Sequence, residues 1–271
     1  MQESASYIHL KELGGLELLK AKFHHKQFSK HAHEGYCIGV IEEGAQSFYR
    51  TGALHLAPKG DIILVNADEI HTGSSAVESG WGYRAIYPTP EMILDVGQDF
   101  FTIKNAVPWF PNAVVHDVGL AQQLILLFDL LEQKQNALLK ESLYLSTLAR
   151  LIYCYDRAKL KPQPHQKLNR EIALVQDLIR SFPERDYSLT ELANVVGISP
   201  WHLLREFKKH TGLPPHSWMI QIRLQKAKTL LKTDLNIADV AQQCGFSDQS
   251  HFNRHFKKAM GVTPTQYLSY F

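Results

Sequence analysis

The stretch GFSDQSHFNRHFKKAMGVTP at Gly245–Pro264 repeats, with changes, the stretch GISPWHLLREFKKHTGLPP at Gly197–Pro215. The two units align at an offset of 48 residues in their first halves and of 49 residues in their second halves. One residue is therefore inserted near the start of the second helix. Such an internal repeat predicts two copies of one structural element in the C-terminal part of the chain.

The positions that both units keep are those that a helix-turn-helix requires. Gly197 and Gly245 can adopt positive φ and so end a first helix. Ser199 and Ser247 are suited to cap the start of a second helix. The spacing predicts helix-turn-helix units at about 188–212 and 236–261. Their shared apolar positions would form the helix contacts: Ala193, Leu203, Phe207, Ala241, Phe252 and Phe256.

The positions that change between the units lie on the outer face of each second helix, mostly near its N-terminus. That part of a recognition helix contacts base edges in the major groove. Pairs of lysines follow and are placed to meet phosphates. The candidate base-contacting residues are Pro200, Trp201, His202, Arg205, Gln249, Ser250, His251, Asn253 and Arg254, and the candidate phosphate-contacting residues are Lys208, Lys209, Lys257 and Lys258.

Between the units lies HSWMIQIRLQKAKTLLK, which is predicted to be helical. About sixteen residues at ~1.5 Å each give a rod of roughly 24 Å, enough to hold two recognition helices near the ~34 Å spacing of successive major grooves. Charge agrees with an anionic partner, because residues 165–271 hold 14 basic and 9 acidic side chains whereas residues 1–164 hold 15 and 18. The alternative is a helical repeat bundle that binds protein, or nothing.

Residues 170–271 resemble the DNA-binding domain of the AraC/XylS family of bacterial transcription regulators. The resemblance covers IADVAQQCGFSDQSHFNRHFKKAMGVTPTQYL and SLTELANVVGISPWHLLREFKKHTGLPPHSWM. It implies two helix-turn-helix units joined by a long helix and double-stranded DNA as the partner, with the candidate residues above as the contacts. Trp201 departs from the pattern, because it places a bulky side chain on the DNA-contacting face.

The N-terminal part has a different pattern. Short strand-like runs, separated by Gly, Pro and Asp, fill residues 1 to about 100 and predict an antiparallel sandwich or barrel. Two amphipathic helices are predicted within about 119–157, and their apolar face must pack on the barrel or on a second copy of the chain. We expect residues 1–157 to form one domain, 158–169 a linker and 170–271 the second domain. The clearest strand-like runs are YCIGVIEE, AQSFYR, GALHLA, GDIILVN and GWGYRAIYP.

Histidines in the first domain indicate a ligand site. His31 and His33 form an H-x-H pair, and His71 follows a P-x-G-D turn and a strand, which resembles the motifs of a cupin barrel. Three imidazoles suit Zn, Fe, Mn or Ni. However, Cys37 replaces the usual glutamate. The N-terminal half also resembles the sensor domain of AraC-type regulators, which implies a cupin barrel that binds a small molecule without metal. We therefore expect no cofactor, with His31, His33 and His71 as the alternative metal ligands. The expected effector pocket comprises His31, His33, Tyr36, His71, Trp81 and Tyr83, although core packing is an equal alternative for Trp81 and Tyr83.

Together these patterns predict an α+β two-domain protein, with a cupin-like antiparallel β-barrel and flanking helices before an all-α tandem helix-turn-helix domain. We expect a sequence-specific transcriptional regulator controlled by a small-molecule effector, and not an enzyme. The helices at about 119–157 would form a homodimer, and RNA polymerase would be a further partner. One alternative is a metal-dependent cupin oxygenase or isomerase with a DNA-binding tail, and another is a nucleoid binder with little sequence preference.

The location of the protein is also predicted from the sequence. No apolar run reaches the roughly eighteen residues that span a bilayer, and the N-terminus lacks the apolar segment of a secretory signal. The three cysteines are scattered and odd in number, which favours free thiols over a disulfide framework. We therefore expect a cytoplasmic bacterial protein without a membrane partner.

Overall fold

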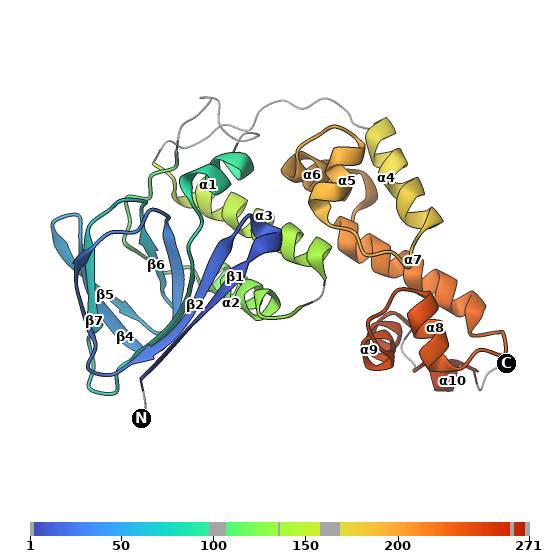
Figure 1. Ribbon diagram of the computed structural model, residues 1–271, viewed down its shortest axis with the longest axis horizontal. Coiled ribbons are helices and arrows are strands. Elements are labelled where there is room, and N and C mark those ends of the chain that lie inside the picture. The colour runs from blue at the N-terminus through green and yellow to red at the C-terminus, as the bar shows by residue number, and fades with distance from the viewer. Residues whose placement is uncertain (1–2, 98–106, 135, 158–168, 261–262, 269–271) are drawn as a thin grey trace. The chain divides into compact units, whose positions relative to one another are not determined.

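The computed structural model describes residues 3–97, 107–134, 136–157, 169–260 and 263–268, and the chain divides into two compact units (Figure 1). The first comprises Met1–Lys134 and Leu143–Pro164, and the second comprises Gln135–Ser142 and His165–Phe271. The predicted linker at 158–169 lies outside the described residues except for Asn169, where a helix begins. Among the described residues, every helix is too short or too polar to span a lipid bilayer.

The first unit is built on an antiparallel sheet with the strand order β1-β2-β8-β4-β6-β9. β4 has fourteen residues and takes part in two sets of pairings: its first part pairs with β6 and β8, and its second part pairs with β5 and β7. The sheet therefore folds over into a barrel-like shape (Figure 1). Its strands are β1 (Ser4–Leu10), β2 (Leu16–Phe23), β3 (Gln27–His31), β4 (Cys37–Arg50), β5 (Ala53–Pro58), β6 (Ile62–Val65), β7 (His71–Ser75), β8 (Trp81–Ile86) and β9 (Val114–Val115).

The sequence pattern suggested two strand-like runs within 36–50, but the structure has one strand there. Gly44 lies between the runs with φ +63°, and the pairing of β4 with β8 shifts register between Ile41 and Glu43. A Cβ atom on residue 44 would lie 1.9 Å from the carbonyl oxygen of Gly80. The glycine thus permits a bulge and a close approach of two strands, so the chain continues instead of turning.

The sheet separates two hydrophobic clusters. In β6, Ile62 and Leu64 belong to a cluster shared with the helices, whereas Ile63 and Val65 belong to the cluster on the opposite face. Side chains alternate between the faces of a strand, so a strand covered on both sides is apolar throughout. This explains why GDIILVN is a continuous apolar run.

Three helices share a hydrophobic cluster with the sheet: α1 (Pro90–Gly97), α2 (Val118–Leu131) and α3 (Ala137–Tyr155). The Asp117 carboxylate caps α2 by accepting a hydrogen bond from the Leu120 N–H at 2.8 Å. The apolar face that the sequence predicted for α2 is buried in the same cluster as Ile38 and Leu64 of the sheet. Burial on its own barrel therefore accounts for this face, which consists of Leu124, Leu127, Phe128 and Leu131.

The second unit is helical and contains the two predicted helix-turn-helix units, α5–α6 and α8–α9. Gly197 and Gly245 adopt φ of +68° and +79° between the paired helices. Ser199 caps α6 as predicted, because its hydroxyl accepts from the His202 N–H at 3.2 Å. Its helices are α4 (Asn169–Ser181), α5 (Leu189–Val195), α6 (Pro200–Thr211), α7 (Pro215–Leu230), α8 (Ile237–Gln243), α9 (Gln249–Met260) and α10 (Pro264–Leu268).

The cap of α9 differs from the prediction. The Asp248 carboxylate, and not the Ser247 hydroxyl, accepts from the His251 N–H at 2.7 Å. The one-residue insertion between the two repeats shifts the helix start by one position, so the capping role passes to the next residue. A carboxylate at a helix N-terminus also interacts favourably with the helix dipole, and these contacts lower the pKa of Asp248.

α7 joins the two helix-turn-helix units, contacting α6 of the first and α8 and α9 of the second. Its sixteen residues match the rod length that the sequence predicted. Arg223 of α7 is buried, and its guanidinium donates to the carbonyl oxygens of Pro183, Arg185 and Gly245 at 2.5–2.9 Å. The Arg223 side chain thus holds the turn of the second helix-turn-helix unit, at Gly245, against the segment that follows α4.

Candidate nucleic-acid interface and ligand cavity

The second helix of the second helix-turn-helix unit, α9, has one buried and one exposed face. Phe252 and Phe256 are fully buried in the hydrophobic cluster of this unit. The predicted base-contacting side chains lie on the remaining surface, where Gln249, Ser250 and Arg254 are exposed and His251 and Asn253 are half-buried. The spacing of the two phenylalanines orients this face, because residues four apart share one side of a helix.

Two histidines of α9, His251 and His255, have pKa values below the ordinary value of 6.5 and are neutral at physiological pH. The rings of His251 and His255 are 4.6 Å apart. Burial lowers the pKa of His255 to about 4 and also lowers the pKa of His251, with the Arg254 charge acting in the same direction. The Ser247 hydroxyl lies 3.2 Å from Nδ1 of His251. A neutral imidazole can both donate and accept a hydrogen bond, which suits contacts with base edges.

The second helix of the first helix-turn-helix unit, α6, differs from α9 in its charges. Pro200, Trp201, His202 and Arg205 are all half-buried. Nε of Arg205 donates to Glu206 at 3.2 Å, and Nζ of Lys209 lies 3.9 Å from the other carboxylate oxygen. Glu206 is buried and thus partly offsets the basic side chains of this helix. The predicted phosphate-contacting residues Lys208, Lys209, Lys257 and Lys258 are exposed.

A cavity of about 290 Å³ lies in the first unit. Its wall includes His31, His33 and His71. Each of the three imidazoles offers one ring nitrogen that could bind a metal ion, and these nitrogens all lie within 4.8 Å of one another. Tyr83 also lines the cavity. Four of the six residues predicted for the effector pocket therefore share one cavity, although they come from three separate parts of the sequence.

Two predicted pocket residues lie elsewhere. Tyr36 is buried in the cluster between sheet and helices, where its hydroxyl donates to the carbonyl oxygen of Pro108 and its ring contacts Phe110. Trp81 is buried beside Phe23, with ring centroids 5.4 Å apart, and does not line the cavity. Tyr36 lies just before β4, outside the strand that holds His31, so the alternation of side chains along that strand does not predict which way Tyr36 points. Trp81 is part of the hydrophobic cluster behind the cavity wall.

Comparison with known proteins gives the family. The family described as "AraC-like ligand binding domain" matches residues 13–148, and the family described as "Helix-turn-helix domain" matches residues 192–270. The chain belongs to the AraC/XylS family of transcriptional regulators. It is a DNA-binding transcriptional regulator with a ligand-binding N-terminal domain.

Relatives of this AraC/XylS regulator carry similar descriptions. The chain is 31% identical over 229 residues to the uncharacterized HTH-type transcriptional regulator YbfI of Bacillus subtilis, covering 83% of this chain and 82% of the relative. It is 36% identical over 101 residues to the transcriptional activator RhaS of Enterobacter, covering 37% and 35%. The solved C-terminal domain of AraT from Geobacillus stearothermophilus is 32% identical, covering 39% of this chain and 89% of that chain with a TM-score of 0.37.

Several cavity residues of this AraC/XylS regulator were not among the predicted site residues. Gln46 of β4 is buried, and its side-chain oxygen accepts no hydrogen bond from the described residues. The alternation of Gln46 and Phe48 along β4 was the available signal, but it does not tell which face of the strand borders a cavity. The additional lining residues with aromatic or uncharged-polar side chains, or with a long charged one, include Tyr7, Phe23, Lys26, Phe28, Gln46, Phe48, Thr72 and Tyr87.

Cys37 occupies the position of the expected cupin glutamate and also lines the cavity. Its thiol is hydrogen-bonded to Tyr87, and burial raises its pKa to about 12. The side chain is therefore a neutral thiol at physiological pH. A neutral thiol is a small, weakly polar group and not a thiolate ligand.

Proposed function

We propose that this regulator binds a small organic effector in the cavity of its first unit, and that effector binding changes the affinity of α6 and α9 for specific DNA sites. The observation that carries this proposal is the wall of the cavity, where aromatic rings surround a few polar groups. Small-molecule sites typically combine apolar walls with a small number of convergent polar groups. The regulatory effect follows if the effector has different affinities for two states of the protein.

The polar groups indicate the kind of effector. Gln46 places an amide oxygen without a described donor on the cavity wall, so a donor on the ligand would remove an unfavourable buried group. Phe28, Phe48 and Tyr83 supply aromatic surface. A volume of about 290 Å³ suits a compact molecule. We propose a small polar metabolite with at least one hydrogen-bond donor.

A thermal-shift screen of sugars, amino acids and small aromatic metabolites tests this proposal. A ligand present at 100 times its Kd stabilises the fold by about 2.7 kcal/mol. Gln46→Leu should weaken binding of the hit by about 10-fold, whereas Gln133→Leu, which changes an exposed glutamine, should leave it unchanged. A hit that binds Gln46→Leu as tightly as the native chain would place the effector elsewhere.

For DNA, we propose that α9 supplies base contacts through Gln249, Ser250, His251, Asn253 and Arg254, and that α6 does so through Pro200, Trp201, His202 and Arg205. The four exposed lysines, Lys208, Lys209, Lys257 and Lys258, contact phosphates. A mobility-shift titration on the DNA upstream of the protein's own gene tests this assignment. His251→Ala and Arg254→Ala should each cost about 1–3 kcal/mol of specific binding, whereas Lys59→Ala in the first unit should cost nothing. Unchanged binding by both α9 variants would remove them from the interface.

We further propose a homodimer through α2 and α3, with RNA polymerase as a partner at the promoter and with no catalytic activity. The predicted apolar face of α2 is buried on its own sheet, so a dimer would use the outer surface of these helices. Val118, Leu126 and Tyr153 are 58–59% exposed there. Sedimentation analysis of Leu126→Glu tests this contact: a native dimer that becomes monomeric supports it, and an unchanged mass contradicts it.

A further inference from the structure

We propose that His31, His33 and His71 form a binding site for one divalent transition-metal ion, with Zn²⁺ as the reference ion, on the wall of the cavity. The centroids of the His31 and His71 rings are 4.3 Å apart, and His33 lies 4.9 Å from each. The ligand atoms of all three lie within 4.8 Å of one another. The site does not depend on the proposed effector, although it shares the same cavity.

The main chain brings the three histidines together. His31 of β3 and His71 of β7 are cross-strand partners in the antiparallel pairing of these strands. The carbonyl oxygen of His33 accepts a hydrogen bond from the Asp68 N–H at 2.8 Å, which ties its segment to the turn before β7. The pairing of the two strands and the turn before β7 therefore set the positions of the three histidines.

The hydrogen bonds of two rings fix the tautomer that metal binding requires. Nδ1 of His31 lies 2.7 Å from the carbonyl oxygen of Ser29, and Nδ1 of His71 lies 3.0 Å from that of Glu69. A carbonyl oxygen only accepts, so both Nδ1 atoms carry the hydrogen and donate it. Each Nε2 then bears the free lone pair. Metal-bound histidines almost always donate their second ring nitrogen in this way.

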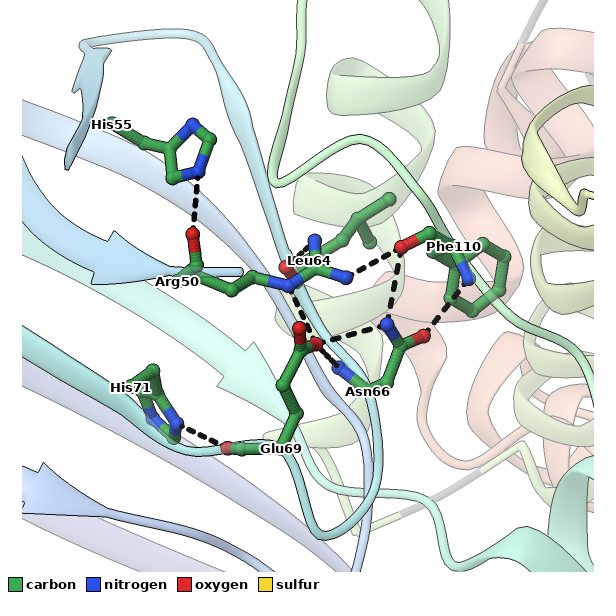
Figure 2. A network of polar contacts seen from close by, with 7 residues as sticks. All are labelled: Arg50, His55, Leu64, Asn66, Glu69, His71 and Phe110. Atoms are coloured by element: carbon green, nitrogen blue, oxygen red, sulfur yellow. Dashed lines mark hydrogen bonds and ion pairs between the residues drawn. The ribbon is translucent and has the colours of Figure 1, made fainter. Parts of the chain in front are cut away.

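Glu69, whose carbonyl oxygen accepts the hydrogen bond from His71, is itself held by a buried network of hydrogen bonds (Figure 2). The Glu69 carboxylate accepts from Nε of Arg50 at 2.6 Å and from Nδ2 of Asn66 at 2.9 Å. Arg50 and Asn66 both donate to the carbonyl oxygen of Phe110. This network fixes the turn that presents the Glu69 carbonyl to the imidazole. Such outer contacts orient a ligand before the ion arrives.

The donor set fits a transition metal. Zinc binds histidine nitrogens at about 2.0–2.1 Å, which places two nitrogens of a tetrahedral site about 3.4 Å apart. Ligand atoms that lie up to 4.8 Å apart would need to approach by at most about 1.4 Å to bind one ion. Imidazole nitrogen suits Zn²⁺, Co²⁺, Ni²⁺ and Cu²⁺, whereas Mg²⁺ and Ca²⁺ prefer oxygen. A site with three protein ligands keeps an open position, so an effector with an oxygen donor would bind the ion directly.

Equilibrium dialysis of the full chain, purified without a histidine tag or metal resin and first treated with chelator, tests the site. With Zn²⁺ or Co²⁺, the native chain and the exposed-histidine control His9→Ala should bind about one equivalent, and His33→Ala and His71→Ala should bind about 100-fold more weakly. Mg²⁺ should not compete. Less than stoichiometric binding by the native chain, or unaltered binding by either cavity variant, would overturn the site.

A second measurement covers the case in which the variants fold poorly. X-ray absorption of the native chain with one equivalent of Zn²⁺ should show three imidazole ligands and no sulfur. A sulfur ligand or fewer imidazoles would exclude this site. Both measurements are made without effector and without DNA, so failure of the metal site and failure of the proposed function can be told apart.

Discussion

Gly197 and Gly245 occupy equivalent positions in the two helix-turn-helix units, but only Gly245 lies against another segment. Both adopt positive φ, +68° and +79°. A Cβ atom on residue 245 would lie 2.5 Å from the carbonyl oxygen of Glu184, whereas one on residue 197 would meet nothing within 4 Å. The two turns therefore have the same backbone conformation but differ in how tightly neighbouring segments pack against them.

This difference predicts unequal effects of one substitution. Gly197→Ala should cost about 1 kcal/mol, the strain of an L-residue in the left-handed region. Gly245→Ala should cost about 2–4 kcal/mol, because main-chain atoms of Glu184 must also move. Urea unfolding of the second unit, assigned by hydrogen exchange in the full chain, measures both values. Equal costs would contradict the close approach of Gly245 to Glu184.

The buried pair of Arg50 and Glu69 should contribute more to stability than an exposed pair. Their side chains are 0% and 9% exposed. Glu69→Gln leaves a buried guanidinium without its carboxylate, and we expect a loss of about 3–5 kcal/mol. Glu43→Gln, which breaks the exposed contact with Lys22, should cost under about 1 kcal/mol. Thermal unfolding of the first unit compares the two, and similar losses would argue against the network of Figure 2.

Acid should destabilise the second unit through His216, which is 6% exposed. Burial, followed by the charges of Arg223, His255 and His251, lowers its pKa from 6.5 to about 4. As pH falls, the unfolded chain binds the proton before the folded chain does. Stability is therefore unaffected above about pH 6.5 and falls between about pH 6.5 and 4, by up to about 3 kcal/mol.

His216→Leu should remove much of this pH dependence when unfolding is measured from pH 7 to 4. A residual slope is expected, because the pKa values of His251 and His255 are lowered as well. His210→Leu serves as the control, since that histidine is exposed on α6. If His216→Leu retained the whole slope, other groups would be responsible for acid sensitivity.

The four exposed lysines predict the salt dependence of DNA binding. Each phosphate contact contributes about −0.9 to the slope of log K against log salt concentration. The double variants Lys208→Ala/Lys209→Ala and Lys257→Ala/Lys258→Ala should each reduce the slope by about 1.8, with weaker binding to all DNA sequences. Lys59→Ala should leave the slope unchanged. A variant pair with the native slope does not contact phosphates.

The sequence predicted elements best where the requirement is local. The two turn glycines, the Ser199 cap and the α7 rod all follow from backbone geometry within a few residues. The α9 cap was predicted one residue early, because both Ser247 and Asp248 can cap a helix and the residue inserted between the repeats moves the helix start to Gln249. The strand runs were found, but their union into β4 depends on Gly44 and on its contact with Gly80 of a distant segment.

The cavity shows the same division. The H-x-H spacing identified His31 and His33 as candidates, and His71 was found because it follows a recognisable strand and turn. Their convergence depends on the pairing of β3 with β7, which no local pattern encodes. The positions of Tyr36 and Gln46 were missed for the same reason, since alternation gives the period of a strand but not which face borders the cavity.

By itself, the sequence determined that this chain has a β-rich first half and a tandem helix-turn-helix second half, because propensity, capping and hydrophobic period act over a few residues. Only the tertiary structure decided that three histidines meet on one wall, that the apolar face of α2 packs on its own sheet, and that Gly245 alone of the two turn glycines touches a neighbouring segment. These contacts join residues far apart in the chain, and their free energies depend on packing that exists only after folding.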